Sequence, residues 1–402
     1  MSKIGIIPPE VEANLDPFGV IITGLGQAAA SFQELGYGVT FLDPTNQRST
    51  VDFLKDDEVE FVYSIRGHGT DWFINDSDGG NVENAFDRFG RTLLTVVANP
   101  PYYPGSLRAL NSPSKMLIVA VTDKDSLSYA DLLNVHGHPI VHLNCAYNSI
   151  SFDARKAQRP AGERAIPVLY VGSYEDPALF RNAWRSQLVK VPHIQDIVET
   201  AAARAIEDES EPVWKVLADE ATQRGVALDI RTPASQQILD LISRYATNLL
   251  RGRLMATLAQ FPAHIVTNRL PETVIPSRHA VIRSPISKAE FLETLHDARA
   301  LAVANPNRMT GSVSERVPDS LRRGSVVLTP PNSSLDHLIG AGLISYGSGR
   351  KHLEAMIDRL VTDPAAYEAP GSAARETAEQ FNPLHRARQI VNIVREFRRA
   401  PD

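Results

Sequence analysis

The first part of the chain alternates short apolar runs with stretches of helical spacing. Apolar runs typical of buried strands occur at residues 3–7, 39–42, 61–64, 93–98, 115–121 and 139–143. The segment 25–35, between the first two runs, has the spacing of an amphipathic helix. Strands that alternate with helices form parallel sheets, whose ligands bind at the carboxyl ends of the strands. The pattern therefore predicts a doubly wound α/β domain.

A second series of the same kind follows a polar stretch. Residues 149–164 are polar and lack periodicity, which places the domain boundary there. A long helical region is predicted over 177–245, with breaks near Pro212 and near 225–233, and a last helix is predicted over 383–399. Apolar runs that indicate strands occur at 165–171, 263–266, 280–283, 300–304 and 326–329. We expect two domains, 1–155 and 165–380, followed by a terminal segment, 381–402.

The composition fits two ordinary globular domains. The chain has 402 residues, of which 43% are hydrophobic and 22% are charged. A net charge of −6 argues against a general affinity for nucleic acid or anionic membranes. Cys145 is the only cysteine, so no intrachain disulfide can form, which fits a reducing compartment. No run is long enough for a signal peptide or a membrane span, and we expect a cytoplasmic protein.

The most informative segment is 312–338. Its pattern predicts a polar turn, a short helix over 315–323, a stop at Gly324, a buried strand over 325–329 and a loop that enters another helix. Acidic side chains near the start of the helix can accept ribose hydroxyls, and backbone N–H groups beside them can hold phosphates. A site for a nucleotide diphosphate needs this combination.

This segment resembles the donor site of glycosyltransferases that have two Rossmann-like domains, the GT-B fold. The resemblance is closest to the bacterial group related to the spore-maturation protein CgeB. Three further segments are similar to the same group in the same order: 99–104 with Asp123, 164–177, and the closing helices between Asp363 and Ile390. The resemblance implies two Rossmann-like doubly wound domains facing a cleft, with the C-terminal helix returning to the first domain.

The resemblance also implies a function. The second domain would bind a nucleotide diphosphate sugar, and the first would hold an acceptor in the interdomain cleft, as in a hexosyltransferase. No cofactor and no metal are expected, because helix dipoles and basic side chains neutralise the leaving diphosphate in this fold. We expect no nucleic-acid partner and no membrane span. The donor base and sugar, the acceptor, the stereochemistry and the oligomeric state stay open.

Candidate donor-binding residues follow strands of the second domain. Gly172 and Ser173 form a loop in which glycine lets backbone amides approach a diphosphate. Glu315, Arg316 and Asp319 share one helix face by their spacing. Arg316 would neutralise phosphate, and Asp319 stands where many family members carry the ribose-binding glutamate. The alternative is an acidic helix start with surface ion pairs.

Other polar residues surround this helix. Ser312 and Ser314 could cap the helix or donate to phosphate. A further anion-binding loop is predicted after the strand 325–329, formed by Thr329, Asn332, Ser333 and Ser334. Gly311 stands where retaining GT-B enzymes often carry a second glutamate, so their two-glutamate motif is absent.

The first domain offers a candidate base. Arg66, Gly67 and Gly69 surround His68 in a loop after a strand, and Asp71 could orient its imidazole. A histidine supported by a carboxylate suits deprotonation of an acceptor hydroxyl. The alternative is a polar loop in which His68 makes a structural hydrogen bond.

Gly24 and Gly26 can be interpreted in two ways. They would form an acceptor-side loop in a GT-B enzyme. Together with Asp43 they also mimic a dinucleotide fingerprint, with 20–23 as the first strand, which would indicate an NAD-dependent oxidoreductase. The run 3–7 is the better first strand. A third alternative is a non-catalytic binding protein of the GT-B fold.

Two patterns suggest metals weakly. Asp123 and Asp125 match a short acidic motif that is common in proteins, and His136, His138 and His142 lie close in sequence. His136 and His138 lie on either side of a glycine turn, and His142 lies in a strand. This arrangement does not favour the geometry of a zinc site. Arg283, Arg308 and Lys351 are further candidate phosphate partners, although such side chains are more often solvated surface charges.

Overall fold

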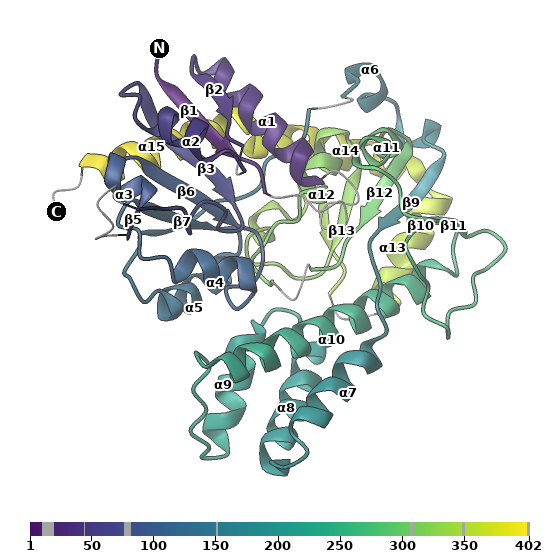
Figure 1. Ribbon diagram of the computed structural model, residues 1–402. Helices are drawn as coiled ribbons and strands as arrows, with labels where there is room; N and C mark the ends of the chain where they lie inside the picture. The colour runs from purple at the N-terminus through teal and green to yellow at the C-terminus, as the bar shows by residue number, and fades with distance from the viewer. Residues whose placement is uncertain are drawn as a thin grey trace. The chain divides into compact units, whose positions relative to one another are not determined.

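The computed structural model describes residues 1–9, 20–43, 45–75, 82–149, 152–305, 309–347 and 350–399. The chain divides into two compact units (Figure 1). The first unit combines Met1–Asn148 with Phe381–Asp402, and the second is Ser149–Gln380. In the described part of the chain, no helix has both the length and the apolar composition needed to cross a membrane.

The first unit is built on a six-stranded parallel sheet of order β2-β1-β3-β6-β7-β8. The strands are β1 (Lys3–Ile7), β2 (Gly38–Phe41), β3 (Val59–Ile65), β6 (Thr92–Val97), β7 (Leu117–Val121) and β8 (Ile140–His142). Every residue of β6 and β7 is buried, as expected for central strands that helices cover on both faces. An antiparallel pair, β4 (Phe73–Asn75) and β5 (Val82–Asn84), stands apart from this sheet.

The helices of the first unit are α1 (Val20–Glu34), α2 (Gln47–Leu54), α3 (Ala85–Phe89), α4 (Pro104–Leu110), α5 (Leu127–Leu133) and α15 (Pro383–Arg399). Leu25, Ala29 and Phe32 place one face of α1 on the sheet, because their spacing is four and three. Ile390 and Val394 of α15 are buried in the same core. The last helix therefore belongs to the first unit, as the predicted fold class requires.

The second unit has another six-stranded parallel sheet, of order β11-β10-β9-β12-β13-β14. Its strands are β9 (Ile166–Val171), β10 (Ala263–Val266), β11 (Val281–Arg283), β12 (Ala298–Ala302), β13 (Val326–Thr329) and β14 (Leu343–Ser345). The helices near the sheet are α6 (Ala154–Ala157), α11 (Lys288–Thr294), α12 (Arg316–Arg322), α13 (Arg350–Thr362) and α14 (Glu368–Ala378). Leu258, the last residue of α10 (Pro233–Leu258), and Ile357 of α13 are buried against the strands.

Four helices separate β9 from β10: α7 (Pro177–Gln187), α8 (Pro192–Glu207), α9 (Val213–Gln223) and α10 (Pro233–Leu258). They form a bundle beside the sheet of the second unit (Figure 1). The predicted breaks near Pro212 and 225–233 are confirmed. A third break, before Pro192, was not predicted, and α10 extends 13 residues beyond the predicted end at residue 245.

The predicted position of Gly24 and Gly26 is wrong. Both lie inside α1, which begins no later than Val20, so neither is in a loop. Residues 20–23 are helical, which removes the first strand of the dinucleotide fingerprint. The physical reason is tertiary packing: the apolar face of α1 outweighs the strand preference of its β-branched start. Asp43, the third part of that fingerprint, accepts hydrogen bonds from Thr45 N and Thr45 Oγ1.

Candidate functional site

The strand order of the second sheet locates its binding edge. In chain order the strands run 3-2-1-4-5-6, and the order reverses between β9 and β12. Ligands of such sheets bind outside the carboxyl ends of the strands at this switch point. The loop after β9 and the segment that enters α12 lie at this edge of the sheet.

Gly172 and Ser173 follow β9 directly. The amide of Gly172 donates to the carbonyl of Val266 at 3.0 Å. A Cβ at Gly172 would lie 2.5 Å from Tyr170 Oη, so the phenol of Tyr170 requires glycine here. Arg251 of α10 donates from Nη1 to the carbonyl and the hydroxyl of the exposed Ser173, at 3.1 and 3.3 Å. A guanidinium is thus fixed beside the predicted glycine loop.

Tyr170 presents an unused polar atom beneath this loop. The side chain is 2% exposed, and its Oη has no hydrogen-bond partner among the residues that the structure describes. Burial raises the pKa of Tyr170, while the positive charges of Arg251 and Arg316 act in the opposite direction. Arg251 also contacts the loop that covers the phenol, through its hydrogen bonds to Ser173. Sequence reasoning missed Tyr170 and Arg251, because Arg251 is 78 residues from the loop that it contacts.

Glu315 and Arg316 are partly exposed charges at the start of α12. Glu315 is the N-cap residue of α12, and its side chain is 35% exposed, against 33% for Arg316. Their charged groups lie 3.7 Å apart. Burial tends to raise the pKa of Glu315, but Arg316 and Lys288 lower it overall, so the carboxylate is ionised at neutral pH. A carboxylate and a guanidinium are thus available side by side.

Asp319 lies on the inner side of the same helix. Its side chain is 1% exposed and pairs with Lys288 Nζ at 2.6 Å, and Lys288 itself is only 6% exposed. The predicted helix face is therefore divided: Glu315 and Arg316 are partly exposed, whereas the carboxylate of Asp319 is enclosed. Its proposed contact with ribose stays a prediction. Lys288 was not among the sequence candidates, because it precedes Asp319 by 31 residues.

The structure brings the predicted loops after β12 and β13 together. Asn332 Nδ2 donates to the carbonyl of Ser312 at 2.8 Å, and Ser334 Oγ donates to the carbonyl of Gly311 at 2.7 Å. Thr329 Oγ1 donates to the carbonyl of Pro330 at 3.0 Å and is buried. These polar groups hold the two loops against each other. Ser314 and Ser333 are half-buried at their edges.

The His68 loop follows β3 in the first unit. Arg66 and Gly67 have positive φ angles of 56° and 73°, and Gly69 has 86°. Gly67 is required because a Cβ there would lie 2.8 Å from the carbonyl oxygen of Gly105. His68 is half-buried within this tight turn, and Asp71 is exposed at its end. The predicted catalytic roles of His68 and Asp71 stay predictions.

The weaker sequence candidates have ordinary positions. Asp123 accepts hydrogen bonds from Asp125 N, at 3.2 Å, and from Ser126 Oγ, and so caps a helical turn. Across the described ranges, no three His, Cys, Asp or Glu residues gather closely enough to hold a metal ion. Arg283 is exposed on β11 and Lys351 is exposed on α13. Arg308 lies outside the described residues.

Comparisons with known proteins give a fold and no family. The chain matches no protein-family model, and no curated protein matches its sequence. It is similar to the structure of sucrose-phosphate synthase from Thermosynechococcus elongatus, with a TM-score of 0.51 and 12% identity over 98% of this chain and 99% of that chain. It is also similar to T4 phage BGT in complex with its UDP-glucose substrate, with a TM-score of 0.50 and 10% identity over 99% of both chains. These likenesses confirm the predicted GT-B fold class.

Proposed function

We propose that the protein is a glycosyltransferase that moves a sugar from a nucleotide diphosphate sugar to an acceptor. The observation that carries the proposal is the buried, unpartnered Tyr170 Oη near two guanidiniums, at the binding edge of the second sheet. A buried hydroxyl without a partner costs free energy, which a ligand oxygen would recover. The fold supports the proposal, because T4 phage BGT takes UDP-glucose as its substrate.

The donor diphosphate would lie over the loop of Gly172 and Ser173. Arg251 and Arg316 would balance its negative charge, and Tyr170 would donate one hydrogen bond to a phosphate oxygen. Two fixed guanidiniums can stabilise the leaving diphosphate without a divalent cation. We therefore propose a metal-independent reaction, which EDTA should leave unchanged.

Glu315 is the better candidate for the hydroxyls of the donor. Its ionised carboxylate is partly exposed beside Arg316, whereas Lys288 encloses that of Asp319. We assign the hydroxyl contact to Glu315 and a structural role to Asp319. Glu315→Gln should then weaken donor binding about tenfold or more, since hydrogen bonds to charged groups contribute roughly 1.5–3 kcal/mol. If Glu315→Gln binds the donor as tightly as the unmodified protein, the hydroxyl contact belongs to Asp319 instead.

The first unit would supply the acceptor side and the base. The acceptor oxygen forms the new bond to the anomeric carbon, and its proton passes to the imidazole of His68. The bond from that carbon to the diphosphate oxygen breaks, which releases a nucleoside diphosphate. Asp71 would orient the imidazole. We place the enzyme in the cytoplasm, on the single cysteine, and among the CgeB-related group, on the sequence segments that resemble it.

Tyr170→Phe is the direct test. The change removes only a hydroxyl that has no partner in the described residues, so the fold should tolerate it. Calorimetry with UDP, GDP and TDP should find one nucleotide that binds, and Tyr170→Phe should bind it about tenfold more weakly. Tyr367→Phe is the matched control, because Tyr367 is buried and its Oη already donates to the Met356 carbonyl. Equal affinity in Tyr170→Phe, or no binding of any nucleotide, would contradict the proposal.

One observation favours a second candidate, a GT-B-fold protein that binds without transferring. Asp319 stands where related enzymes carry a ribose-binding glutamate, and here the carboxylate is enclosed by Lys288. Such a protein would bind a nucleotide and leave a sugar donor intact. Release of free nucleotide from the matching donor, measured with and without candidate acceptors, separates the two candidates. Slow release above the uncatalysed rate would exclude the second.

A further inference from the structure

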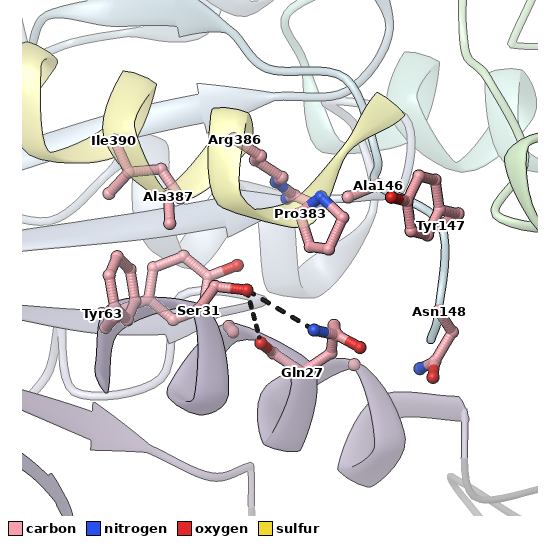
Figure 2. Close-up of a pocket in the computed structure, with 13 residues that line it drawn as sticks. Gln27, Ser31, Tyr63, Ala146, Tyr147, Asn148, Pro383, Arg386, Ala387 and Ile390 are labelled. Atoms are coloured by element: carbon pink, nitrogen blue, oxygen red, sulfur yellow. Dashed lines mark hydrogen bonds between the residues drawn. The ribbon is translucent and has the colours of Figure 1, made fainter. Parts of the chain in front are cut away.

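The first unit contains a small pocket of its own between α1 and α15 (Figure 2). About 70 Å³ is open to the centres of water-sized molecules, whereas one water needs only roughly 10–15 Å³ by this measure. The pocket therefore admits a group of several heavy atoms. Its polar lining consists of Gln27, Ser31, Tyr63, Tyr147, Asn148 and Arg386.

The charge of the pocket is unbalanced. Among the residues that the structure describes, Arg386 is the only charged residue that lines the pocket, and no aspartate or glutamate does. The Nε atom of Arg386 is shielded from solvent and has no hydrogen-bond partner among the described residues. Arg386 also forms no ion pair with any residue that the structure describes. A guanidinium that is partly removed from water without an anion is costly, so this pocket favours a negatively charged ligand.

Tyr63 supplies a second donor. Its side chain is 4% exposed and its ring packs edge-on against Phe32, with ring centres 6.0 Å apart. Tyr63 Oη makes no hydrogen bond to the other residues drawn in Figure 2. Ser31 is already engaged, because its hydroxyl donates to the Gln27 carbonyl at 2.9 Å. Arg386 and Tyr63 can therefore both donate hydrogen bonds to a ligand.

The pocket lies where the first sheet would bind a ligand. In this sheet the strand order reverses between β1 and β3. Tyr63 belongs to β3, and Gln27 and Ser31 belong to α1, the described helix that follows β1. The His68 turn follows the same strand β3. Ligands of doubly wound sheets bind at such a switch point, so topology and charge indicate the same position.

We infer that this pocket binds an oxyanion, the carboxylate or phosphate group of a small molecule, through Arg386 and Tyr63. Its described lining offers hydrogen-bond donors and one positive charge and contains no carboxylate, which favours an anion over a cation. If the protein transfers sugar as proposed above, the anion is part of the acceptor, and the acceptor is an acidic or phosphorylated compound. The binding of a free anion does not depend on that proposed function.

Free anions test the pocket directly. Inorganic phosphate and acetate, each compared with chloride at equal ionic strength, should raise the melting temperature of the full chain by about 2 °C or more near saturation. Arg386→Gln should abolish the rise, and Tyr63→Phe should reduce it. Arg388→Gln is the matched control, because Arg388 is exposed two residues further along α15. No rise in the unmodified protein, or the same rise in Arg386→Gln, overturns the inference.

A second readout separates the acceptor from a free effector. Arg386→Gln should leave nucleotide affinity unchanged, because all lining residues of the pocket belong to the first unit. Transfer to a phosphorylated or carboxylated acceptor should show a KM about tenfold higher in this variant, with no change for its neutral analogue. Anion binding without any nucleotide binding would keep the pocket and remove the proposed transferase. Nucleotide binding without stabilisation by anions would keep the proposed transferase and rule out the anion pocket.

Discussion

Lys288 of α11 and Asp319 of α12 form an ion pair that is almost closed to solvent, and α12 is the helix that the sequence predicts as part of a ligand site. The pair could not be predicted from sequence, since nothing in the spacing of the two residues links α11 to α12. Asp319 is one methylene shorter than glutamate, and its carboxylate meets the lysine at 2.6 Å. The carboxylate of Glu315 is thus more exposed than that of Asp319, a difference that residue type alone does not report.

Lys288→Met should destabilise the second unit by about 3–5 kcal/mol, because it leaves the carboxylate of Asp319 buried without its partner. Urea unfolding followed by the fluorescence of Trp184, which is fully buried in this unit, measures the change. Lys156→Met is the matched control: its pair with Glu293 spans 3.0 Å and both side chains are about half exposed, so solvent screens the pair and we expect little or no change in stability. A similar loss of stability in both variants would show that the buried pair stabilises the unit no more than the exposed pair does.

At the scale of elements, strands were easier to predict than helix boundaries. The run 326–329 is apolar, β-branched and fully buried as β13, so its composition and environment agree. The run 20–23 has similar composition but is helical, because Leu25, Ala29 and Phe32 anchor α1 in the core. The break between α7 and α8 has a local signal that was missed: Pro192 is the first residue of α8, a position that proline favours.

Gly324 ends α12 as the sequence predicted, with a φ of 73°. A Cβ at this position would collide first with Arg375 Nη1. It would also lie 3.0 Å from both the Ala157 carbonyl oxygen and Arg164 Nη2, which are hydrogen-bonded to each other. Gly324→Ala should therefore cost more than the roughly 1–2 kcal/mol of a left-handed alanine, because it also disturbs the buried guanidinium of Arg164. Thermal unfolding of the second unit measures the loss.

Gly225→Ala is the matched control for this prediction. Gly225 follows α9 with a φ of 67°, and nothing lies within 4 Å of its would-be Cβ. Gly225→Ala should therefore lower the stability only by the cost of placing alanine in the left-handed conformation. If both variants lose the same stability, crowding around Gly324 is unimportant and Arg164 tolerates displacement.

At the scale of the molecule, the two ends of the chain complete one unit. Tyr63 and Arg386 meet in one pocket although more than 300 residues separate them in sequence, and no local pattern reports such a juxtaposition. The alternation of elements predicted two parallel sheets, and the resemblance of the closing segment predicted the return of the last helix. Neither could predict which side chains of α15 and β3 would share a cavity, since that depends on the packing angle of α15.

Ile390→Ala tests whether each unit depends on its own core. Ile390 is 2% exposed and packs with Val391 and Val394 of α15 in the core of the first unit. Its truncation should cost about 2–5 kcal/mol, the range for buried isoleucine to alanine. Trp72 is the only tryptophan of the first unit, so a Trp184→Phe/Trp214→Phe background reports on that unit alone.

In that background Ile390→Ala should move the Trp72 transition to lower urea, and Asn392→Ala, an exposed position on the same helix, should not. In the complementary Trp72→Phe background, Ile390→Ala should leave the Trp184 transition in place, because no residue of α15 belongs to the buried core around β9 and α10. A joint shift of both transitions would mean that the two cores unfold as one cooperative body. The C-terminal helix would then stabilise the second unit as well as its own.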